Sequence, residues 1–267
     1  MSILHLSALP EQERRRRCAA VVPGKVFESV AGIGHGALSG GPDNPLALRV
    51  DAVADVPRLH IGVPAMRIAG DFAFSLELAE AGAGQLELAF IIINDLRAPR
   101  FNIDTDARGK PTLLGTATRN LREEERALRA GLGPSQVRLG LRALSEMLPR
   151  LEHFAQTLGY VAIQLEALTY HVAVMYEQAG FAYVSGRRRM AAINAAFAPG
   201  GKLFDALDGS SPFRQRTLWT TPRGRAWAVH DGILTHLDGE PNLKVEMVKV
   251  IGQDARQRTF DLTAKAE

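Results

Sequence analysis

Residues 158–184 read LGYVAIQLEALTYHVAVMYEQAGFAYV, and this stretch decides the predicted fold. Apolar and polar side chains alternate over residues 161–168, as in a strand with one buried face. Residues 170–179 carry apolar side chains at helical spacing, and Gly180 is the residue type that ends helices in a left-handed conformation. Residues 181–184 are β-formers. The sequence therefore predicts a strand, a helix and a second strand in this order.

This stretch resembles the C-terminal half of the GNAT superfamily of acyl-CoA-dependent N-acyltransferases. In that family a strand ending I-x-L-x-V leads into a helix ending A-x-x-L-Y-E-K-x-G-F, and another strand follows. The matching residues here are 163–167 (IQLEA) and 174–181 (VMYEQAGF). The resemblance implies a mixed α/β (α+β) fold with a GNAT-like, mostly antiparallel central sheet flanked by helices, extended by helical and C-terminal insertions.

The remaining sequence contains further predicted strands. They are expected at residues 46–53, 59–63, 72–78, 86–94, 100–105, 218–237 and 243–251. Glycines at 82 and 84 predict a hairpin between the strands at 72–78 and 86–94. Alternation in the first of these two predicts one buried face, whereas the continuous apolar run 90–93 predicts a strand buried on both sides.

Helices are predicted at residues 11–22, 121–130 and 136–158, with Pro149 kinking or dividing the last one. Residues 187–210 are expected to form a helix and a loop. We expect an N-terminal helix and Gly-rich loop over residues 1–45. The acyltransferase domain would then cover residues 46–267, with an insertion at about 187–240 because connections are usually about 2–6 residues long.

Acyl transfer from a thioester to an amine requires a deprotonated amine, a stabilised oxyanion and a proton for the leaving thiolate. The resemblance implies that Tyr176 is the acid, because family members often use a Tyr in the helix after the strand. Its phenol has an ordinary pKa near ~10 and stays protonated at neutral pH. The alternative is an amphipathic core Tyr whose hydroxyl reaches the surface. His171 is a candidate base, but a lone His near an apolar helix face is usually structural.

The resemblance implies acetyl-CoA or another acyl-CoA as the acyl donor, bound beside Leu165 and Ala167 of the predicted strand. The family places the pattern Q/R-x-x-G-x-G/A at a helix start, where backbone N–H groups meet the pyrophosphate. The stretch that opens the predicted helix supplies three candidate pyrophosphate-binding residues: Arg138, Gly140 and Arg142. Residues 108–110 and 129–133 also come near the pattern. None of the three stretches has its full spacing, so a loop adapted to another acyl carrier stays open.

The sequence singles out no general base. Asp95, Asp104 and Asp106 lie at predicted strand ends, where a base could sit, but acidic residues there are more often turn formers. No two His residues are spaced to bind a metal around a Glu. Cys18 is the single cysteine, so no intrachain disulfide can form, which favours a reducing, cytoplasmic location.

The chain carries a net charge of +3 and a pI of about 9.2, with Arg clusters at 14–17, 187–189 and 214–225. No apolar run is long enough for a membrane span. The resemblance implies a small-molecule or protein amine as acceptor, and it leaves a homodimer open. A non-catalytic GNAT-like protein that binds a ligand or partner is the alternative. Nucleic-acid binding through the Arg clusters is the weakest reading, because no aromatic-rich basic stretch accompanies them.

Overall fold

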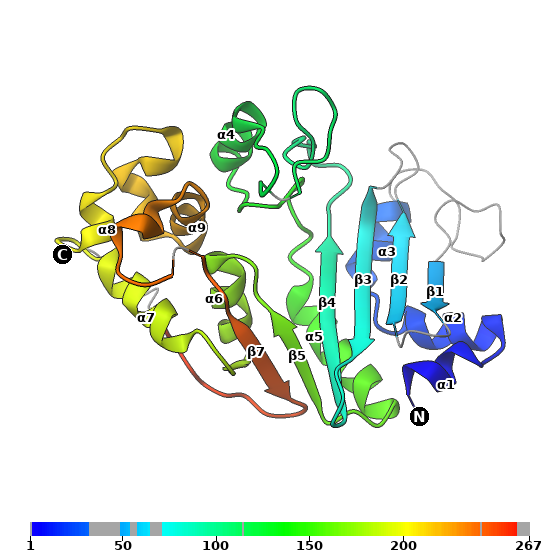
Figure 1. Ribbon diagram of the computed structural model, residues 1–267. Coiled ribbons are helices and arrows are strands. Elements are labelled where there is room, and N and C mark those ends of the chain that lie inside the picture. The colour runs from blue at the N-terminus through cyan, green and yellow to red at the C-terminus, as the bar shows by residue number, and fades with distance from the viewer. Residues whose placement is uncertain are drawn as a thin grey trace. The chain divides into compact units, whose positions relative to one another are not determined.

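The computed structural model describes residues 2–31, 49–53, 58–64, 71–113, 115–240 and 242–260 (Figure 1). The chain forms two compact units, each built from separate stretches. The first unit comprises Met1–Pro99, Leu139–Leu165 and Lys249–Gln253, and the second comprises Arg100–Arg138, Glu166–Val248 and Asp254–Glu267. The Gly-rich loop predicted within residues 1–45 lies mostly outside the described residues.

The first unit contains a sheet in the order β1-β2-β3-β4-β5. Its strands are β1 (Arg49–Val53), β2 (Arg58–Pro64), β3 (Phe72–Glu80), β4 (Gln85–Ile93) and β5 (Ala162–Glu166). The first four strands pair antiparallel with their neighbours, and β4 pairs parallel with β5. The predicted β3–β4 hairpin is confirmed. Gly82 and Gly84 both have positive φ in its turn, which glycine adopts without strain.

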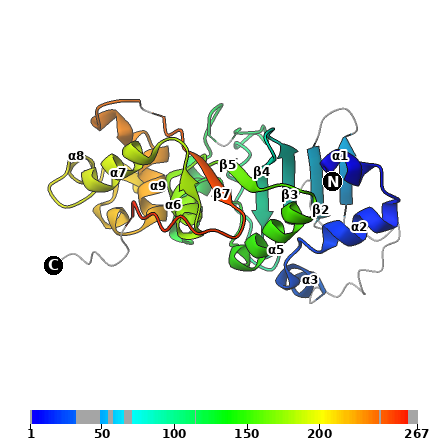
Figure 2. The same ribbon diagram turned by 90° about the horizontal axis from the view of Figure 1, so that it is seen from below.

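The helices in the described part of the first unit are α1 (Ile3–Ser7), α2 (Glu11–Ala19), α3 (Gly24–Ala31) and α5 (Leu144–Thr157). Figures 1 and 2 show α3 and α5 on the same side of β2, β3 and β4. The side chains that α5 buries recur at helical spacing: Met147, Leu148, Leu151, Phe154 and Ala155. This amphipathic face explains why the segment folds as a helix against the sheet.

The burial of β3 and β4 differs from the sequence prediction. Residues 73–76 of β3 are buried on both faces, so the expectation of one buried face is wrong. Conversely, Phe90 of β4 is 41% exposed and Ile91, Ile92 and Ile93 are only half-buried, although this run was expected to be buried on both sides. The reason is that β4 loses its β5 neighbour after Glu87, where the parallel ladder ends.

The second unit is mainly helical. Its elements are α4 (Leu121–Arg129), α6 (Tyr170–Gln178), β6 (Ala182–Tyr183), α7 (Arg187–Ala196), α8 (Lys202–Asp205), η1 (Pro212–Arg214), η2 (Arg216–Thr220), α9 (Pro222–His230), η3 (Ile233–His236) and β7 (Glu246–Val250). β6 and β7 pair antiparallel. One cluster of its buried core consists of Phe101, Ile103, Ala127, Leu132, Phe213 and Trp227. The predicted helices at 121–130 and 170–179 and the strand at 243–251 are confirmed.

Residues 218–237 are helical, so the predicted strands there are wrong. The Thr221 hydroxyl accepts a hydrogen bond from the Gly224 N–H at 3.0 Å, and Pro222 occupies the first turn of α9. This cap and this proline are start signals for a helix, and they outweigh the apolar residues that suggested strands.

Residues 100–105 do not form the predicted strand either. The Asn120 amide donates to the Thr105 carbonyl at 2.8 Å, and Arg100 pairs with Asp104 at 2.6 Å. The Asn120 side chain therefore occupies a backbone carbonyl that a neighbouring strand would otherwise pair.

The helix predicted at 136–158 begins only at Leu144. The residues before it run along the end of β4, where the Asp95 N–H donates to the Leu139 carbonyl at 2.9 Å. Pro149 lies inside α5 and does not divide it.

In each unit, a backbone hydrogen bond joins a residue next to β5 to a residue next to β7. Within the first unit the Ile251 N–H donates to the Val161 carbonyl at 3.0 Å, and within the second the Ala167 N–H donates to the Val245 carbonyl at 2.8 Å. The fold is a mixed α/β arrangement with a mostly antiparallel sheet, as predicted.

Among the described residues, every helix is too short or too polar to cross a bilayer.

Candidate functional site

In the first unit, β4 and β5 run side by side only at their beginnings. The parallel ladder joins Gln85–Glu87 to residues 162–164 and ends there. On its other edge β4 stays paired with β3 as far as Ile93. Among the described residues, the second half of β4 therefore has a ladder partner on one edge only, and the sheet opens between the two parallel strands.

A β-bulge marks the place where this opening begins. Leu78 of β3 pairs with Leu88, and its neighbour Glu77 pairs with Phe90, so Ala89 is the extra residue. A bulge bends its strand and increases the local twist, and bulges are common beside functional sites. Beyond the bulge β4 presents only apolar side chains, including the exposed ring of Phe90.

The chain returns to the end of β4 just before α5 begins. Gly140 forms an isolated antiparallel bridge with Asn94. A Cβ atom added to Gly140 would lie 2.9 Å from the Ile93 carbonyl oxygen, so only glycine allows this close approach. Gly140 thus holds the segment that leads into α5 against the open half of β4.

Arg142 follows at the start of α5 with an unusual backbone. Its φ is +53°, a left-handed conformation that costs a residue other than glycine about 1 kcal/mol or more. Its side chain is exposed, and no described residue forms an ion pair or hydrogen bond with it. The first N–H groups of α5, a helix of 14 residues, have no partner within the helix and attract anions.

In the second unit, Tyr176 lies in the last turns of α6 and is 3% exposed. Its ring meets the edge of Phe181 with 5.1 Å between ring centres. Burial raises the pKa of the Tyr176 phenol above its ordinary value. The hydroxyl makes no hydrogen bond to any described residue. Tyr176 is therefore a protonated phenol whose proton is not committed to a neighbour.

His171, the candidate base, is enclosed on the same helix and is 7% exposed. Nδ1 lies 3.0 Å from the Thr169 hydroxyl, while Nε2 has no hydrogen-bond partner among the described residues. A Cβ added to Gly133 would lie 2.3 Å from Nε2. Burial, followed by the nearby charge of Arg223, lowers the pKa of His171 to about 3. The imidazole is therefore neutral and packed, which favours the structural reading.

The two units divide the other predicted cofactor-binding residues. Gly140, Arg142 and Leu165 belong to the first unit, whereas Arg138 and Ala167 belong to the second. Leu165 and Ala167 are buried, and the Ala167 N–H is already bonded to a carbonyl. Arg138 is 9% exposed. Of these residues, Arg142 has the most accessible charged group.

The three candidate aspartates are engaged in local contacts. Asp95 pairs with Arg97 at 3.0 Å. Asp106 accepts hydrogen bonds from the N–H groups of Arg108 and Lys110. Together with the Arg100–Asp104 pair, these contacts are those of turn-forming residues, and they single out no base.

Cys18 is fully buried, and burial raises the pKa of its thiol to about 12. The thiol is therefore a poor nucleophile.

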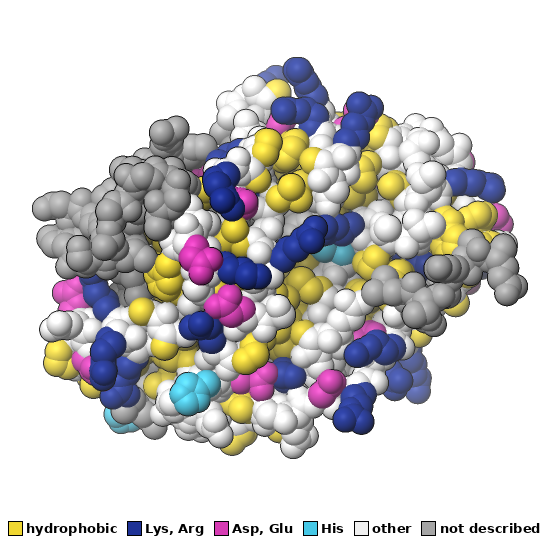
Figure 3. Space-filling model, turned by 180° about the vertical axis from the view of Figure 1, so that it is seen from behind, with side chains coloured by type: hydrophobic (Ala, Val, Ile, Leu, Met, Phe, Trp, Pro, Cys, Tyr) yellow, Lys and Arg dark blue, Asp and Glu magenta, His cyan; other side chains and the backbone are white. Residues whose placement is uncertain are grey.

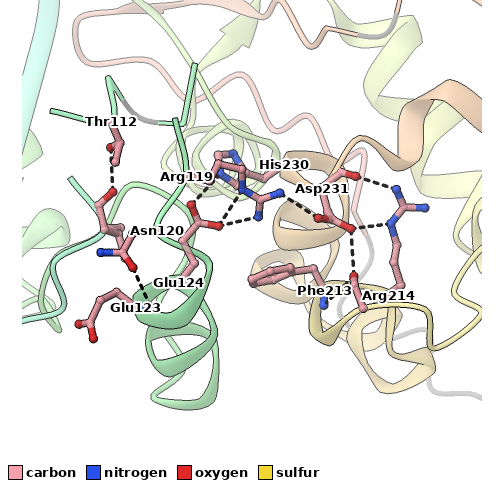
Figure 4. A network of polar contacts seen from close by, with 11 residues as sticks. Thr112, Arg119, Asn120, Glu123, Glu124, Phe213, Arg214, His230 and Asp231 are labelled. Carbon is pink, nitrogen blue, oxygen red and sulfur yellow. Dashed lines mark hydrogen bonds and ion pairs between the residues drawn. The ribbon is translucent and has the colours of Figure 1, made fainter. Parts of the chain in front are cut away.

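The second unit also contains a polar network that sequence reasoning missed (Figure 4). Arg119, before α4, pairs with Glu124 at 2.5 Å and with Asp231 at 2.9 Å. Asp231 also pairs with Arg214 at 3.0 Å, and His230 Nε2 lies 3.7 Å from Glu124. A hollow of about 20 Å³, large enough for a water molecule, lies beside it. The hollow is lined by Ile103, Asp104, Gly115, Glu124, Ser135, Trp227 and His230.

Glu124 is 2% exposed, and its burial alone would raise the pKa of its carboxyl group. The contact with His230 and the hydrogen bonds from Arg119 outweigh burial, so the pKa is lowered. The network thus fastens the start of α4 to the end of α9. Residues 112 apart form the Arg119–Asp231 contact, so no local pattern could have revealed it.

Arg119→Ala should lower the free energy of unfolding of the second unit by about 2–3 kcal/mol, because it leaves the buried Glu124 without its main partner. Both tryptophans, Trp219 and Trp227, belong to this unit, so urea unfolding followed by tryptophan fluorescence measures its stability. The control is Arg129→Ala, which removes an exposed i,i+4 pair and should cost at most about 0.5 kcal/mol. Equal losses in both variants would contradict a stabilising network.

Most cations of the Arg clusters are engaged within the chain. In α2, Arg15 pairs with Glu11, and Arg16 and Arg17 pair with Glu13. In the second unit, contacts to carboxylates or main-chain carbonyls hold Arg189, Arg214, Arg223 and Arg225. On the face shown in Figure 3, Lys and Arg side chains are interspersed with acidic and apolar ones. These contacts favour intramolecular roles over a continuous basic surface for nucleic acid.

Comparison of the chain with protein-family models, with curated proteins and with solved structures finds no match. Within the described part of the chain, no group of three or more His, Cys, Asp or Glu side chains could hold a metal ion.

Proposed function

We propose that this protein is an acyl-CoA-dependent N-acyltransferase of the GNAT type that acts on a small-molecule or protein amine. The observation that carries the proposal is the parallel pair β4–β5, whose ladder ends at Glu87. The pair lies next to antiparallel strands, and a bulge follows its last rung. The opening is a natural place for an extended ligand beside β4.

The chemistry of an acyl-CoA suits this opening. Its pantetheine arm is extended and carries two amide groups, which can hydrogen-bond to the unpaired edge of a strand as an added strand would. Its hydrocarbon parts can contact the apolar side chains that follow Ala89, among them Phe90. Both features of β4 therefore support an acyl thioester as ligand.

The start of α5 supports a pyrophosphate site. In the family pattern G-x-G/A the second position favours a small residue, and Arg142 stands two residues after Gly140 with a positive φ. A positive φ is a conformation that glycine, a residue type of the pattern, adopts without strain, and the Arg142 side chain adds an exposed cation. Arg binds phosphate groups through a two-pronged arrangement of donors.

Tyr176 is assigned the role of the acid that protonates the leaving thiolate. Its raised pKa keeps the phenol protonated, and its hydroxyl is not engaged with a described residue. The acceptor and the acyl chain length stay open. The alternative, a non-catalytic GNAT-like protein that binds a ligand or partner, is favoured by the incomplete Q/R-x-x-G-x-G/A pattern, and it predicts that no acyl group is transferred.

Scanning calorimetry with acetyl-CoA and longer acyl-CoAs tests the proposal. A ligand at ~100 times its dissociation constant should stabilise the folded protein by ~2.7 kcal/mol and raise its unfolding temperature. Gly140→Ala should abolish most of this upward shift, because the added methyl group collides with the Ile93 carbonyl and displaces the segment before α5.

Gly24→Ala is the matched control, because its added Cβ meets only Glu146 at 3.5 Å, an ordinary contact. This variant should keep the full shift. If no acyl-CoA shifts the wild-type transition, the proposed cofactor is wrong. If acyl-CoA binds but amines remain unacylated, the non-catalytic alternative holds.

A further inference from the structure

The carboxyl group of Glu177 lies directly after Tyr176 in α6 and is fully buried. Three hydrogen bonds reach it. The Tyr183 and Thr259 hydroxyls each donate to Oε2 at 2.5 Å, and the Thr259 N–H donates to Oε1. Thr259 therefore supplies two of the three bonds that hold the end of α6 in place. A buried carboxyl group that loses such donors is destabilised strongly.

The C-terminal segment, residues 254–260, carries Thr259 and is itself anchored in the second unit. Arg258 Nη1 donates to the Glu177 main-chain carbonyl at 3.2 Å. Phe260 is 4% exposed, and its ring centre lies 4.7 Å from the guanidinium carbon of the buried Arg225. Contacts thus hold the segment on both sides of Thr259, whose hydroxyl bonds to Glu177.

This anchoring matters for Tyr176, because the Tyr176 hydroxyl makes no hydrogen bond of its own to a described residue. Its position depends on the contact with Phe181 and on the rotation of α6. Neighbouring residues of a helix point about 100° apart, so a fixed Glu177 side chain fixes the direction of the Tyr176 side chain. A misplacement of about 1 Å at a reacting group can cost up to about 10²-fold in rate.

We propose that Thr259 is a positioning residue for the acid Tyr176, acting through Glu177. The inference rests on the proposed acyltransferase function for its effect on rate. Its structural part, the placement of the Tyr176 ring by Thr259, can be measured without any turnover.

The experiment uses the full chain labelled with 3-fluorotyrosine at its four tyrosines, with Tyr176→Phe assigning the ¹⁹F signal of Tyr176. Thr259→Val keeps the side-chain shape and removes the hydroxyl, and it should move or broaden this signal. It should also lower kcat for acyl transfer ~10-fold and leave KM for acyl-CoA unchanged. A loss of this size corresponds to the free energy of about one hydrogen bond to a charged group. Thr259→Ser should restore both.

The matched control is Thr220→Val, because the exposed Thr220 hydroxyl bonds only to the Thr217 carbonyl at 3.0 Å. It should change neither readout. Should Thr259→Val fail to fold, Tyr183→Phe removes the third hydrogen bond and should shift the same ¹⁹F signal.

An unchanged Tyr176 signal in folded Thr259→Val overturns the inference. A shifted signal in a protein without acyl-transfer activity supports the placement and refutes the proposed function instead. An unchanged kcat beside a shifted signal overturns the catalytic part of the inference.

Discussion

The second unit should lose about 2 kcal/mol of stability between pH 6.5 and pH 5, and about 4 kcal/mol by pH 3, because of His171 alone. Burial holds the pKa of His171 at about 3 in the folded protein, against 6.5 in an unfolded chain. Between these values the unfolded chain binds a proton that the folded protein excludes. Acidification therefore favours unfolding in this window, and above pH 6.5 the effect is absent.

Urea unfolding followed by tryptophan fluorescence measures this loss, because both tryptophans lie in the same unit as His171. His171→Asn keeps a polar group near Thr169 and cannot titrate. The difference in unfolding free energy between wild type and this variant should change with pH by the amounts given above for His171. The control is His236→Asn, at an exposed position in η3 of the same unit, which should leave the pH dependence of wild type unaltered. Parallel curves for wild type and His171→Asn would show that the imidazole binds a proton as readily in the folded state as in the unfolded chain, and would contradict the prediction.

Tyr176→Phe should lower the turnover of acyl transfer by ~10²–10⁴-fold, the usual contribution of a positioned general acid. The variant lacks only a hydroxyl that bonds to no described residue, so its stability should change by less than about 1 kcal/mol. Initial rates with an acyl-CoA and a panel of amines give the turnover, and tryptophan fluorescence gives the stability.

Tyr170→Phe is the comparison on the same helix. The Tyr170 hydroxyl accepts a hydrogen bond from the buried Arg225 at 3.3 Å, so this variant should lose stability and keep its turnover. Both substitutions remove a phenol hydroxyl from α6. Tyr176→Phe should lower turnover and keep stability, whereas Tyr170→Phe should lower stability and keep turnover. Full activity in Tyr176→Phe would remove this residue from the mechanism and leave it as a core tyrosine.

Local patterns predicted those parts of the fold that local interactions determine. The strand, helix and strand of residues 158–184 follow from side-chain periodicity and from Gly180, whose φ is +88°. The β3–β4 hairpin follows from two glycines in its turn. The helix α9 was missed because the prediction followed the apolar residues of this segment. In the folded chain, the cap Thr221 and the proline Pro222 start a helix there.

The candidate site depended on contacts that a sequence does not display. The exposure of Phe90 follows from the early end of the β4–β5 ladder, which pairs residues far apart in the chain. The left-handed backbone of Arg142 could not be expected, because residues other than glycine rarely adopt it. Gly140 was identified from its place in a motif, but its closeness to the Ile93 carbonyl belongs to the folded chain.

The division of the chain into two units has a consequence for how the protein can be made and dissected. The chain passes from one unit to the other five times, at positions 99/100, 138/139, 165/166, 248/249 and 253/254. Each unit consists of three separate stretches, so no continuous fragment consists of one unit alone and neither can be expressed alone by cutting the gene once. Each unit therefore depends on contacts between stretches that lie far apart in the sequence. Contacts between such distant stretches slow folding, and the first unit is complete only when residues 249–253 have joined residues 1–99 and 139–165.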